Sequence, residues 1–416
     1  CVMYKKINKC RICGNKNLVS IIDLGMQKLT GVFPKPGQEI NEGPLELVKC
    51  VAENGNCCGL VQLRHSCSEE EMYGINYGYR SGLNSDMVSH LESITNKIEK
   101  LVRLSDGDIV VDIGSNDATL LKSYHHNKLD FIGIDPTGIK FRRFYPENIQ
   151  LIPDFFSAEN FKNCRAGKKA KVITSIAMFY DLEEPQKFAN DIEEILDDNG
   201  IWLLEQSYLP AMLETNSYDT ICQEHLEFYC LAQIQYLAKK AGMKVIDVEQ
   251  NRINGGSFQL MVAKETSGYA VSDRVKEMEE WEHISGYGTL CPFEEFKNKV
   301  ELHKEQLMRF LKEEKAKGKV VLGYGASTKG NVLLQYCGIT SEYIAAIAEV
   351  NEDKFGCVTP GTNIPIVSEE DARAMNPDYF VVLPWHFRDF ILKKEEAYRK
   401  KTKCKFVFPL PQLEIV

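Results

Sequence analysis

Two acidic residues that follow apolar strands are the first candidates for chemistry in this sequence. The run 110–117, Val-Val-Asp-Ile-Gly-Ser-Asn-Asp, is an apolar strand that ends in Asp112-x-Gly114 and opens into a helix. About twenty residues later a second apolar strand ends in Asp135, where a carboxylate can accept hydrogen bonds from both ribose hydroxyls. This pattern predicts an adenosine-type ligand.

The residues after Gly114 narrow the choice of nucleoside. Glycine lets the backbone approach a ligand closely, but Ser115, Asn116 and Asp117 stand where a pyrophosphate cradle needs further glycines. S-adenosylmethionine, whose methionine end is small and zwitterionic, therefore fits better than NAD, although an ordinary α/β turn also contains Asp and Gly. The candidate cofactor-binding residues are Asp112, Gly114, Asn116, Asp135, Asp154 and Phe155.

Four cysteines near the start of the chain predict a structural zinc site. Cys10 and Cys13 form a C-x-x-C knuckle, and Cys50 and Cys58 supply a second pair with seven residues between them. Zinc would stabilise a segment that is too small to hold a core of its own. Adjacent Cys57 competes with Cys58 as the fourth ligand, and buried cysteines without a metal are the alternative.

An adjacent acid and histidine, Glu224 and His225, follow the predicted strand 201–205. Loops beyond the carboxyl ends of parallel strands line the ligand crevice, so His225 is a candidate general base, because its unperturbed pKa of about 6.5 suits proton removal near neutrality. A partly buried histidine in a helix cap is the alternative.

A glycine-containing loop, 323–330, lies between a predicted strand and a helix. Its backbone N–H groups, the helix dipole and Lys329 together predict phosphate binding. The spacing matches neither G-x-G-x-x-G nor the Walker pattern, so the motif is weak on its own.

The elements that must position these residues form two α/β patterns in series. Apolar runs at 109–113, 131–134, 172–175 and 201–205 alternate with helical patterns, which predicts a doubly wound, Rossmann-like methyltransferase core after an amphipathic helix at 86–102. An antiparallel pair at 244–248 and 258–263 turns at 255–256. A second α/β pattern has strands at 319–322, 343–348, 379–383 and 405–408. We predict a zinc-binding domain at 1–80, a methyltransferase domain at 81–265 and an α/β domain at 266–416.

Composition limits the class of partner. The 416 residues carry a formal net charge of -9, which argues against general nucleic-acid binding, and no apolar run has membrane-spanning length. The first residues lack the apolar segment of a secretory signal, so we expect a cytoplasmic protein whose fourteen cysteines are thiols or metal ligands rather than disulfides. No obligate protein partner is indicated.

The ordered set of motifs resembles the sugar C-methyltransferases of deoxysugar biosynthesis. The resemblance runs nearly end to end, through both cysteine pairs and the segments 59–63, 77–82, 111–117, 224–226, 254–257 and 323–327. It implies S-adenosylmethionine as donor, a structural zinc ion, and a nucleotide-linked 4-keto-6-deoxy sugar methylated at C3 through an enolate. It also implies His225 as base with Glu224 beside it and Tyr79 reaching the active site. The candidate substrate-binding residues are Tyr77, Asn254, Gly325, Ser327 and Lys329.

Two positions depart from the pattern of the tetronitrose-type members of that family. Cys222 replaces a tyrosine and Asp181 replaces a histidine, which leaves the identity of the sugar open. Two other functions compete with sugar C-methylation. One is O-methylation of a nucleotide sugar or surface-polysaccharide precursor, and the other is a non-catalytic zinc-dependent scaffold.

Overall fold

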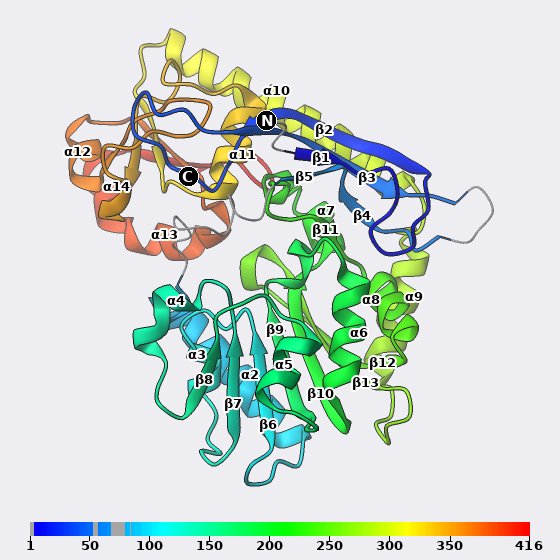
Figure 1. Ribbon diagram of the computed structural model, residues 1–416. Coiled ribbons are helices and arrows are strands. Elements are labelled where there is room, and N and C mark those ends of the chain that lie inside the picture. Colours follow the sequence, from blue (N-terminus) through cyan, green and yellow to red (C-terminus); the bar gives the residue numbers. More distant parts are fainter. Residues whose placement is uncertain (1–3, 53–56, 68–79, 84) are drawn as a thin grey trace.

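The computed structural model describes residues 4–52, 57–67, 80–83 and 85–416, which form three main sheets with their helices and a separate two-stranded sheet (Figure 1). The N-terminal strands and the C-terminal α/β unit lie together at one end of the molecule, and the central sheet lies at the other. Helix α10 (Cys291–Ala316) runs along the end that the N-terminal and C-terminal units share.

The central sheet has seven strands in the order β12-β13-β10-β9-β6-β7-β8. All run parallel except β13, which is inserted antiparallel between β10 and β12. The strands are nearly continuous apolar runs because both faces are covered. Their bounds are β6 Ile109–Ile113, β7 Asp130–Ile134, β8 Ile149–Ile152, β9 Ala170–Ile176, β10 Leu196–Ser207, β12 Met243–Asn251 and β13 Ser257–Lys264.

Helices pack on both faces of this sheet, as the predicted doubly wound pattern requires. One face is covered by α2 (Ser85–Leu101) and α3 (Thr119–Lys122), whose apolar residues form a cluster with Val110, Phe131 and Leu203. The other face is covered by α5 (Ala158–Cys164), α6 (Pro185–Ile195) and α8 (Leu231–Lys240). Shorter elements are α4 (Gly138–Phe141) and α7 (Leu209–Glu214).

The N-terminal sheet is completed by a strand from the central part of the chain. Its order is β11-β4-β3-β2, all antiparallel, with β2 Leu18–Lys28, β3 Glu42–Cys50 and β4 Val61–Leu63. The fourth strand is β11 (Glu227–Phe228), which begins two residues after His225. A separate pair joins β1 (Tyr4–Lys6) to β5 (His65–Cys67). Segment 1–80 therefore shares its main sheet with the candidate catalytic loop.

The C-terminal unit is a second doubly wound sheet, in the order β16-β15-β14-β17-β18-β19. The strand order reverses between β15 and β17 on either side of β14, so the loops that follow β14 and β17 meet at a topological switch point. The bounds are β14 Val321–Tyr324, β15 Ile347–Glu349, β16 Ile366–Ser368, β17 Tyr379–Val382, β18 Lys405–Phe408 and β19 Glu414–Ile415, with α9 Asp273–Ile284, α11 Thr328–Cys337, α12 Glu369–Ala374, α13 Arg388–Lys394 and α14 Glu396–Thr402.

Most predicted elements are present, and the differences are local. The strand predicted at 343–348 is shorter because residues before Ile347 are held in a turn, in which the Tyr343 and Ile344 amides both donate to the Thr340 carbonyl. Strands β8, β16 and β19 were not predicted, because each has only two to four residues. The antiparallel pair at the end of the central sheet is as predicted, but its turn begins earlier than the predicted 255–256, with a 3-10 turn at Ile253–Gly255.

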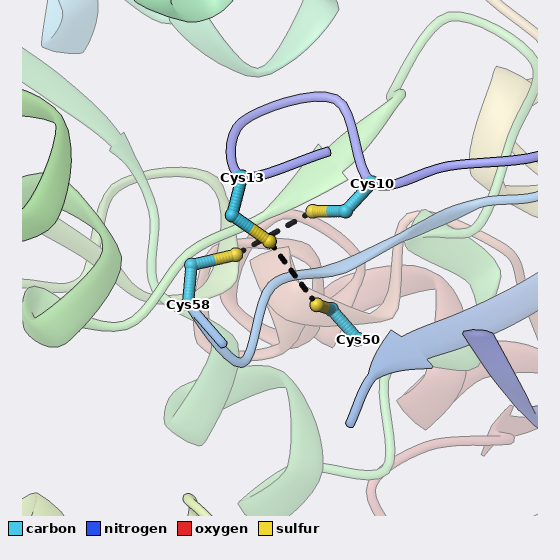
Figure 2. Close-up of side chains that lie close together, drawn as sticks. All are labelled: Cys10, Cys13, Cys50 and Cys58. Atoms are coloured by element: carbon cyan, nitrogen blue, oxygen red, sulfur yellow. Dashed lines mark hydrogen bonds between the residues drawn. The ribbon is translucent and has the colours of Figure 1, made fainter. Parts of the chain in front are cut away.

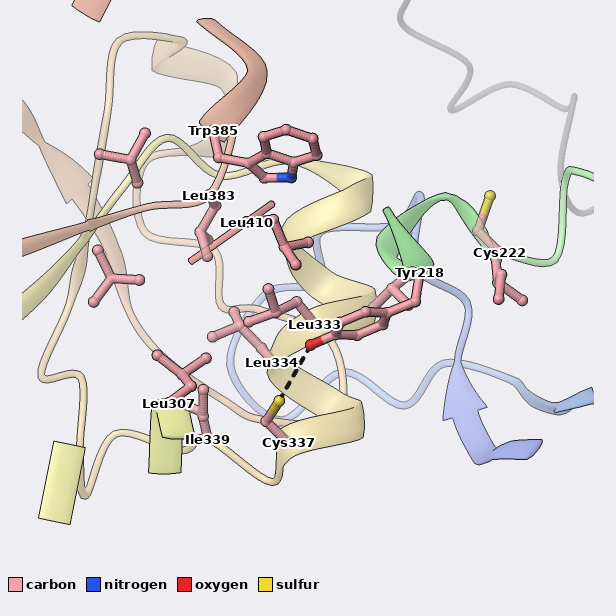
Figure 3. Packing of buried hydrophobic residues seen from close by; sticks show 14 of the residues in the cluster. Tyr218, Cys222, Leu307, Leu333, Leu334, Cys337, Ile339, Leu383, Trp385 and Leu410 are labelled. Atoms are coloured by element: carbon pink, nitrogen blue, oxygen red, sulfur yellow. Dashed lines mark hydrogen bonds between the residues drawn. The ribbon is translucent and has the colours of Figure 1, made fainter. Parts of the chain in front are cut away.

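Residues after β2 lie where the three parts of the chain meet. Thr30, which is 1% exposed, donates its hydroxyl to Oε1 of Gln223 (3.0 Å), and its carbonyl accepts from Nδ2 of Asn331 on α11 (2.8 Å). One apolar cluster likewise contains residues of all three parts, and Figure 3 shows Tyr218 of the central chain packed against α11 with its hydroxyl toward Cys337. The three parts therefore share one core around the loop that carries His225.

Across the described part of the chain, none of the helices combines the length and the apolar character that crossing a bilayer requires. None of the cysteines within the described ranges forms a disulfide.

Candidate functional site

Four cysteine sulfurs converge at the N-terminal knuckles (Figure 2). The Sγ atoms of Cys10, Cys13, Cys50 and Cys58 all lie within 4.8 Å of one another, and the pairs 10–58 and 13–50 are each 3.4 Å apart. Tetrahedral zinc with Zn–S bonds of about 2.3 Å places its sulfurs about 3.8 Å apart, so the cluster fits the ion closely. The thiol of Cys57 points instead toward the Cys50 carbonyl (3.7 Å), so Cys58 is the fourth member.

The knuckle is shaped by local hydrogen bonds that leave the sulfurs facing inward. The Gly14 amide donates to the Cys10 carbonyl (3.0 Å), and Nδ2 of Asn15 donates to the Cys50 sulfur (3.4 Å). Hydrogen bonding to Cys10 lowers the pKa of the Cys13 thiol. Four cysteine sulfurs gathered at this separation are the ligand set that a structural zinc ion binds as thiolates.

A cavity of about 500 Å³ lies at the carboxyl ends of β6, β7 and β9. Four of the predicted cofactor residues line it, namely Gly114, Asn116, Asp135 and Phe155. Gly114 has a φ of 74°, and a Cβ there would lie 3.2 Å from Met178, so glycine keeps this edge of the cavity open.

Asp135 is held rigidly at the edge of this cavity. Its Oδ2 accepts from the Asn116 amide, and its Oδ1 accepts from the amide and hydroxyl of Thr137, each at 2.7 Å. These bonds fix the carboxylate in the wall of the cavity and leave acceptor capacity on Oδ2. An acid in this position can accept a hydrogen bond from a ribose hydroxyl.

Asp112 lies in a second cavity of about 210 Å³ that adjoins the first, since both are lined by Ser81, Gly114, Ile176 and Ala177. The Asp112 side chain accepts one hydrogen bond, from the Thr174 hydroxyl (2.6 Å), and burial raises its pKa to about 7. A buried carboxyl group of this kind is stabilised in its charged form by a nearby cation. The ammonium or sulfonium of S-adenosylmethionine would supply one.

The last two predicted cofactor residues, Asp154 and Phe155, are adjacent in the chain, but only Phe155 lines a cavity. Phe155 lines the larger cavity and is half exposed. Asp154 is not among the lining residues, and its carboxylate accepts hydrogen bonds from the Phe155 amide (2.7 Å) and from Nδ2 of Asn160 (3.2 Å). Asp154 thus shapes the turn that presents Phe155.

His225 is oriented by a backbone carbonyl. Its Nδ1 lies 2.8 Å from the carbonyl oxygen of Thr220. A carbonyl only accepts, so Nδ1 carries the proton in the neutral ring and Nε2 is left as the acceptor. The ring packs edge to face on Tyr180, with centroids 4.6 Å apart. His225 therefore has the tautomer that a general base needs.

The cavities form a series from Asp135 to His225. A small third cavity of about 20 Å³ is lined by His225, and it shares Tyr180 and Asn254 with the cavity that Asp112 lines. A donor bound across the first two cavities would therefore direct its methionine end toward the histidine.

Glu224 lies beside His225 in the chain but contacts a different element. A Cβ on Gly31 would lie 2.3 Å from Oε1 of Glu224, so the carboxyl group lies directly against the backbone of the N-terminal segment. Burial raises the pKa of Glu224. The predicted residues Tyr77 and Tyr79 fall outside the described residues. Thr220, which orients His225, was missed because a main-chain acceptor leaves no signal in the sequence.

The predicted phosphate loop meets the central part of the chain. Lys329 donates to the Asn254 carbonyl (3.1 Å), which brings together two of the candidate substrate residues. Ser327 caps α11 by accepting from the Gly330 amide, and Gly325 has a φ of 81° with its backbone against Pro384. The Ala326 amide is engaged by Glu349, a residue at the end of β15 that the sequence analysis missed.

The strand order and the site together define a class of protein. A doubly wound sheet with an antiparallel last strand pair, an acid at the carboxyl end of each of the first two strands, and a cavity without a phosphate cradle are the features of a methyltransferase that uses S-adenosylmethionine.

Family comparisons assign the chain within that class. Three family models match successive parts of it: "Putative zinc binding domain" at 10–73, "Methyltransferase domain" at 87–248 and "C-methyltransferase C-terminal domain" at 252–411. These matches show that the chain is similar to C-methyltransferases, and the predicted architecture of zinc-binding segment, Rossmann-like core and C-terminal α/β unit is confirmed.

One curated relative is similar over its whole length. The C-methyltransferase NovU of Streptomyces niveus is 27% identical over 421 residues, which span 100% of this chain and 98% of NovU. Among solved structures, an O-methyltransferase family protein from Burkholderia thailandensis has 17% identity and a TM-score of 0.34, over 45% of this chain and 59% of its own. The CcbJ methyltransferase from Streptomyces caelestis has 10% identity and a TM-score of 0.33, over 42% and 89%.

We expect Cys58→Ser to lose the metal, whereas Cys57→Ser should keep it, because only the Cys58 sulfur belongs to the cluster. The loss should lower the thermal midpoint of the chain, since zinc binding and folding of this segment are coupled. Elemental analysis of the purified variants and thermal unfolding test this. Equal zinc content in the two variants would contradict the assignment.

We expect the affinity for S-adenosylmethionine to fall below about pH 7, because protons then compete with the donor for Asp112. The expected slope is up to about tenfold per pH unit. Asp112→Asn should weaken binding by about 1.5–3 kcal/mol and flatten this pH dependence. Titration calorimetry from about pH 5.5 to about 8.5 measures both effects, and an unchanged slope in the variant would exclude Asp112 as their source.

Proposed function

We propose that the protein transfers a methyl group from S-adenosylmethionine to C3 of a nucleotide-linked 4-keto-6-deoxy sugar, with His225 as the general base. The observation that carries the proposal is the bond from Nδ1 of His225 to the Thr220 carbonyl, which leaves Nε2 free to take a proton beside the cavities that fit the donor. The full-length similarity to a C-methyltransferase supports transfer to carbon.

The chemistry follows from the acceptor. A keto group at C4 acidifies the C–H bond at C3, so Nε2 of His225 removes that proton and the electron pair moves into an enolate. S-adenosylmethionine supplies an electrophilic methyl group next to a sulfonium. The enolate carbon forms the new C–C bond as the C–S bond breaks, the keto group re-forms, and the abstracted proton remains on His225.

Other residues of the chain support this step. The neutral His225 that Thr220 orients needs no second acid to set its tautomer, so we assign Glu224 to the contact between the His225 loop and the backbone at Gly31. Tyr79 remains our candidate for donating a hydrogen bond to the enolate oxygen. For the nucleotide diphosphate we propose the loop that carries Gly325, Ser327 and Lys329, which lies at the switch point of the C-terminal sheet.

The acceptor is identified by incubation of the protein with a panel of nucleotide 4-keto sugars and methyl-labelled donor, followed by NMR of the product. We expect a new methyl group on C3, and deuterium from the solvent should enter C3 in the absence of donor. A methyl group on oxygen without C3 exchange would indicate an O-methyltransferase. Absence of saturable donor binding by calorimetry would indicate a scaffold.

We expect His225→Ala to lose about 10²–10⁴ of turnover, the usual effect of a lost general base, and to lose C3 exchange in parallel. Donor affinity should stay within about twofold, because Asp112 and Asp135 are unchanged. Glu224→Gln is the matched control, and it should lose less turnover than His225→Ala. A His225→Ala protein that methylates at the parental rate would place the base elsewhere.

A further inference from the structure

Arg11 lies inside the first cysteine knuckle, and its guanidinium points away from the sulfurs into the protein. The side chain is 2% exposed. Its Nη1 donates to the Leu63 carbonyl (2.6 Å), its Nη2 donates to the Ser66 hydroxyl (2.8 Å), and its main-chain amide donates to Oε1 of Gln62 (3.1 Å). These bonds hold the guanidinium against β4 and β5.

The same guanidinium faces two carboxylates from the central part of the chain. Nε of Arg11 donates to Oε2 of Glu183 (3.3 Å) and lies 3.7 Å from Oε1 of Glu227. Glu183 lines the larger cavity and follows the turn that contains Tyr180. Glu227 is the first residue of β11, directly after the His225 loop. Arg11 therefore touches the segments on both sides of the contact between Tyr180 and His225.

The carboxylate of Glu227 depends on Arg11 because it has no hydrogen-bond partner among the described residues. The Glu227 side chain is also fully buried. Burial strongly raises its pKa, and Arg11 is the group that opposes this effect. A carboxylate buried in this way is costly without its counterion, so Arg11 and Glu227 hold each other in place.

The two segments are also joined directly. The amide of Leu226 donates to the Tyr180 carbonyl (2.9 Å), and the Leu63 amide donates to the Leu226 carbonyl (2.8 Å). Leu226 lies between His225 and Glu227, so protection of its amide reports whether the histidine loop is docked on both the turn that carries Tyr180 and the N-terminal sheet.

We propose that Arg11 is a positioning residue. Through it, the folded cysteine knuckle fixes the position of the His225 loop relative to the side of the donor cavity that Glu183 lines. Arg11 touches neither donor nor acceptor. The proposal rests on His225 being the base, and it assigns to the N-terminal knuckle a role in placing that base.

The test is hydrogen exchange of the full chain in Arg11→Met, with Arg64→Met as the matched control. Arg64 belongs to the same region and pairs with Glu46 (2.9 Å), but it contacts neither Glu183 nor Glu227. In Arg11→Met we expect exchange at 181–184 and 224–228 to rise at least about tenfold, with zinc content by elemental analysis unchanged. Arg64→Met should leave those segments at the parental rate.

A second variant separates a lost counterion from general unfolding. Replacing Glu227 by Gln in the Arg11→Met background removes the buried charge, so exchange at 224–228 should return at least halfway to the parental rate. Arg11→Lys keeps the positive charge but lacks the planar guanidinium, so its exchange rate at 224–228 should lie between those of the parent and Arg11→Met. If Arg11→Met fails to fold, the double variant and Arg11→Lys provide the same comparison.

Three results would overturn the proposal: parental exchange at 224–228 in Arg11→Met, an equal rise in Arg64→Met, or no recovery in the double variant. These measurements need no acceptor sugar, so they stand apart from any failure of the panel to identify one. With an acceptor in hand, kcat of Arg11→Met should fall at least about tenfold while its KM stays within about twofold, which distinguishes a displaced base from weakened binding.

Discussion

The pairing of β11 with β4 is the constraint on which the arrangement of the site depends. It is a short antiparallel contact, with Glu227 opposite Gln62, yet it joins the segment after His225 to the sheet that the cysteine knuckles hold. Because the knuckle is small, its own order depends on the four-sulfur cluster. The order of the cysteine knuckle, of the N-terminal sheet and of the His225 loop is therefore coupled.

The candidate site also lies where a loop of the C-terminal sheet contacts a turn of the central sheet. In the central sheet, Asp135 accepts a hydrogen bond from the main-chain amide of Asn116. In the C-terminal sheet, Glu349 accepts one from the main-chain amide of Ala326. In each sheet, therefore, an acid at the end of one strand holds the glycine-containing turn that follows the neighbouring strand. Lys329 then joins the C-terminal loop to Asn254. Loops of both sheets therefore meet at Asn254, which lines the small cavity beside His225.

Residues whose role depends on local pattern could be predicted. The apolar strand before Asp112, the acid at Asp135 and the C-x-x-C knuckle have periodicities and spacings that their chemistry requires. Residues whose role depends on contacts far along the chain could not. Thr220 acts through its carbonyl, Glu349 ends a strand of three residues, and Arg11 contacts partners more than 170 positions away.

The sequence by itself determined the class of each unit, since strand and helix periods, the Asp-x-Gly turn and the four cysteines are properties of short segments. The tertiary structure alone decided that Cys58 rather than Cys57 completes the cluster, that Asp154 lies outside the cavity lining, and that the His225 loop is shared with the N-terminal sheet. The physical reason is that these outcomes depend on the direction of side chains and on long-range pairing, and both are set only when all three parts close around one core.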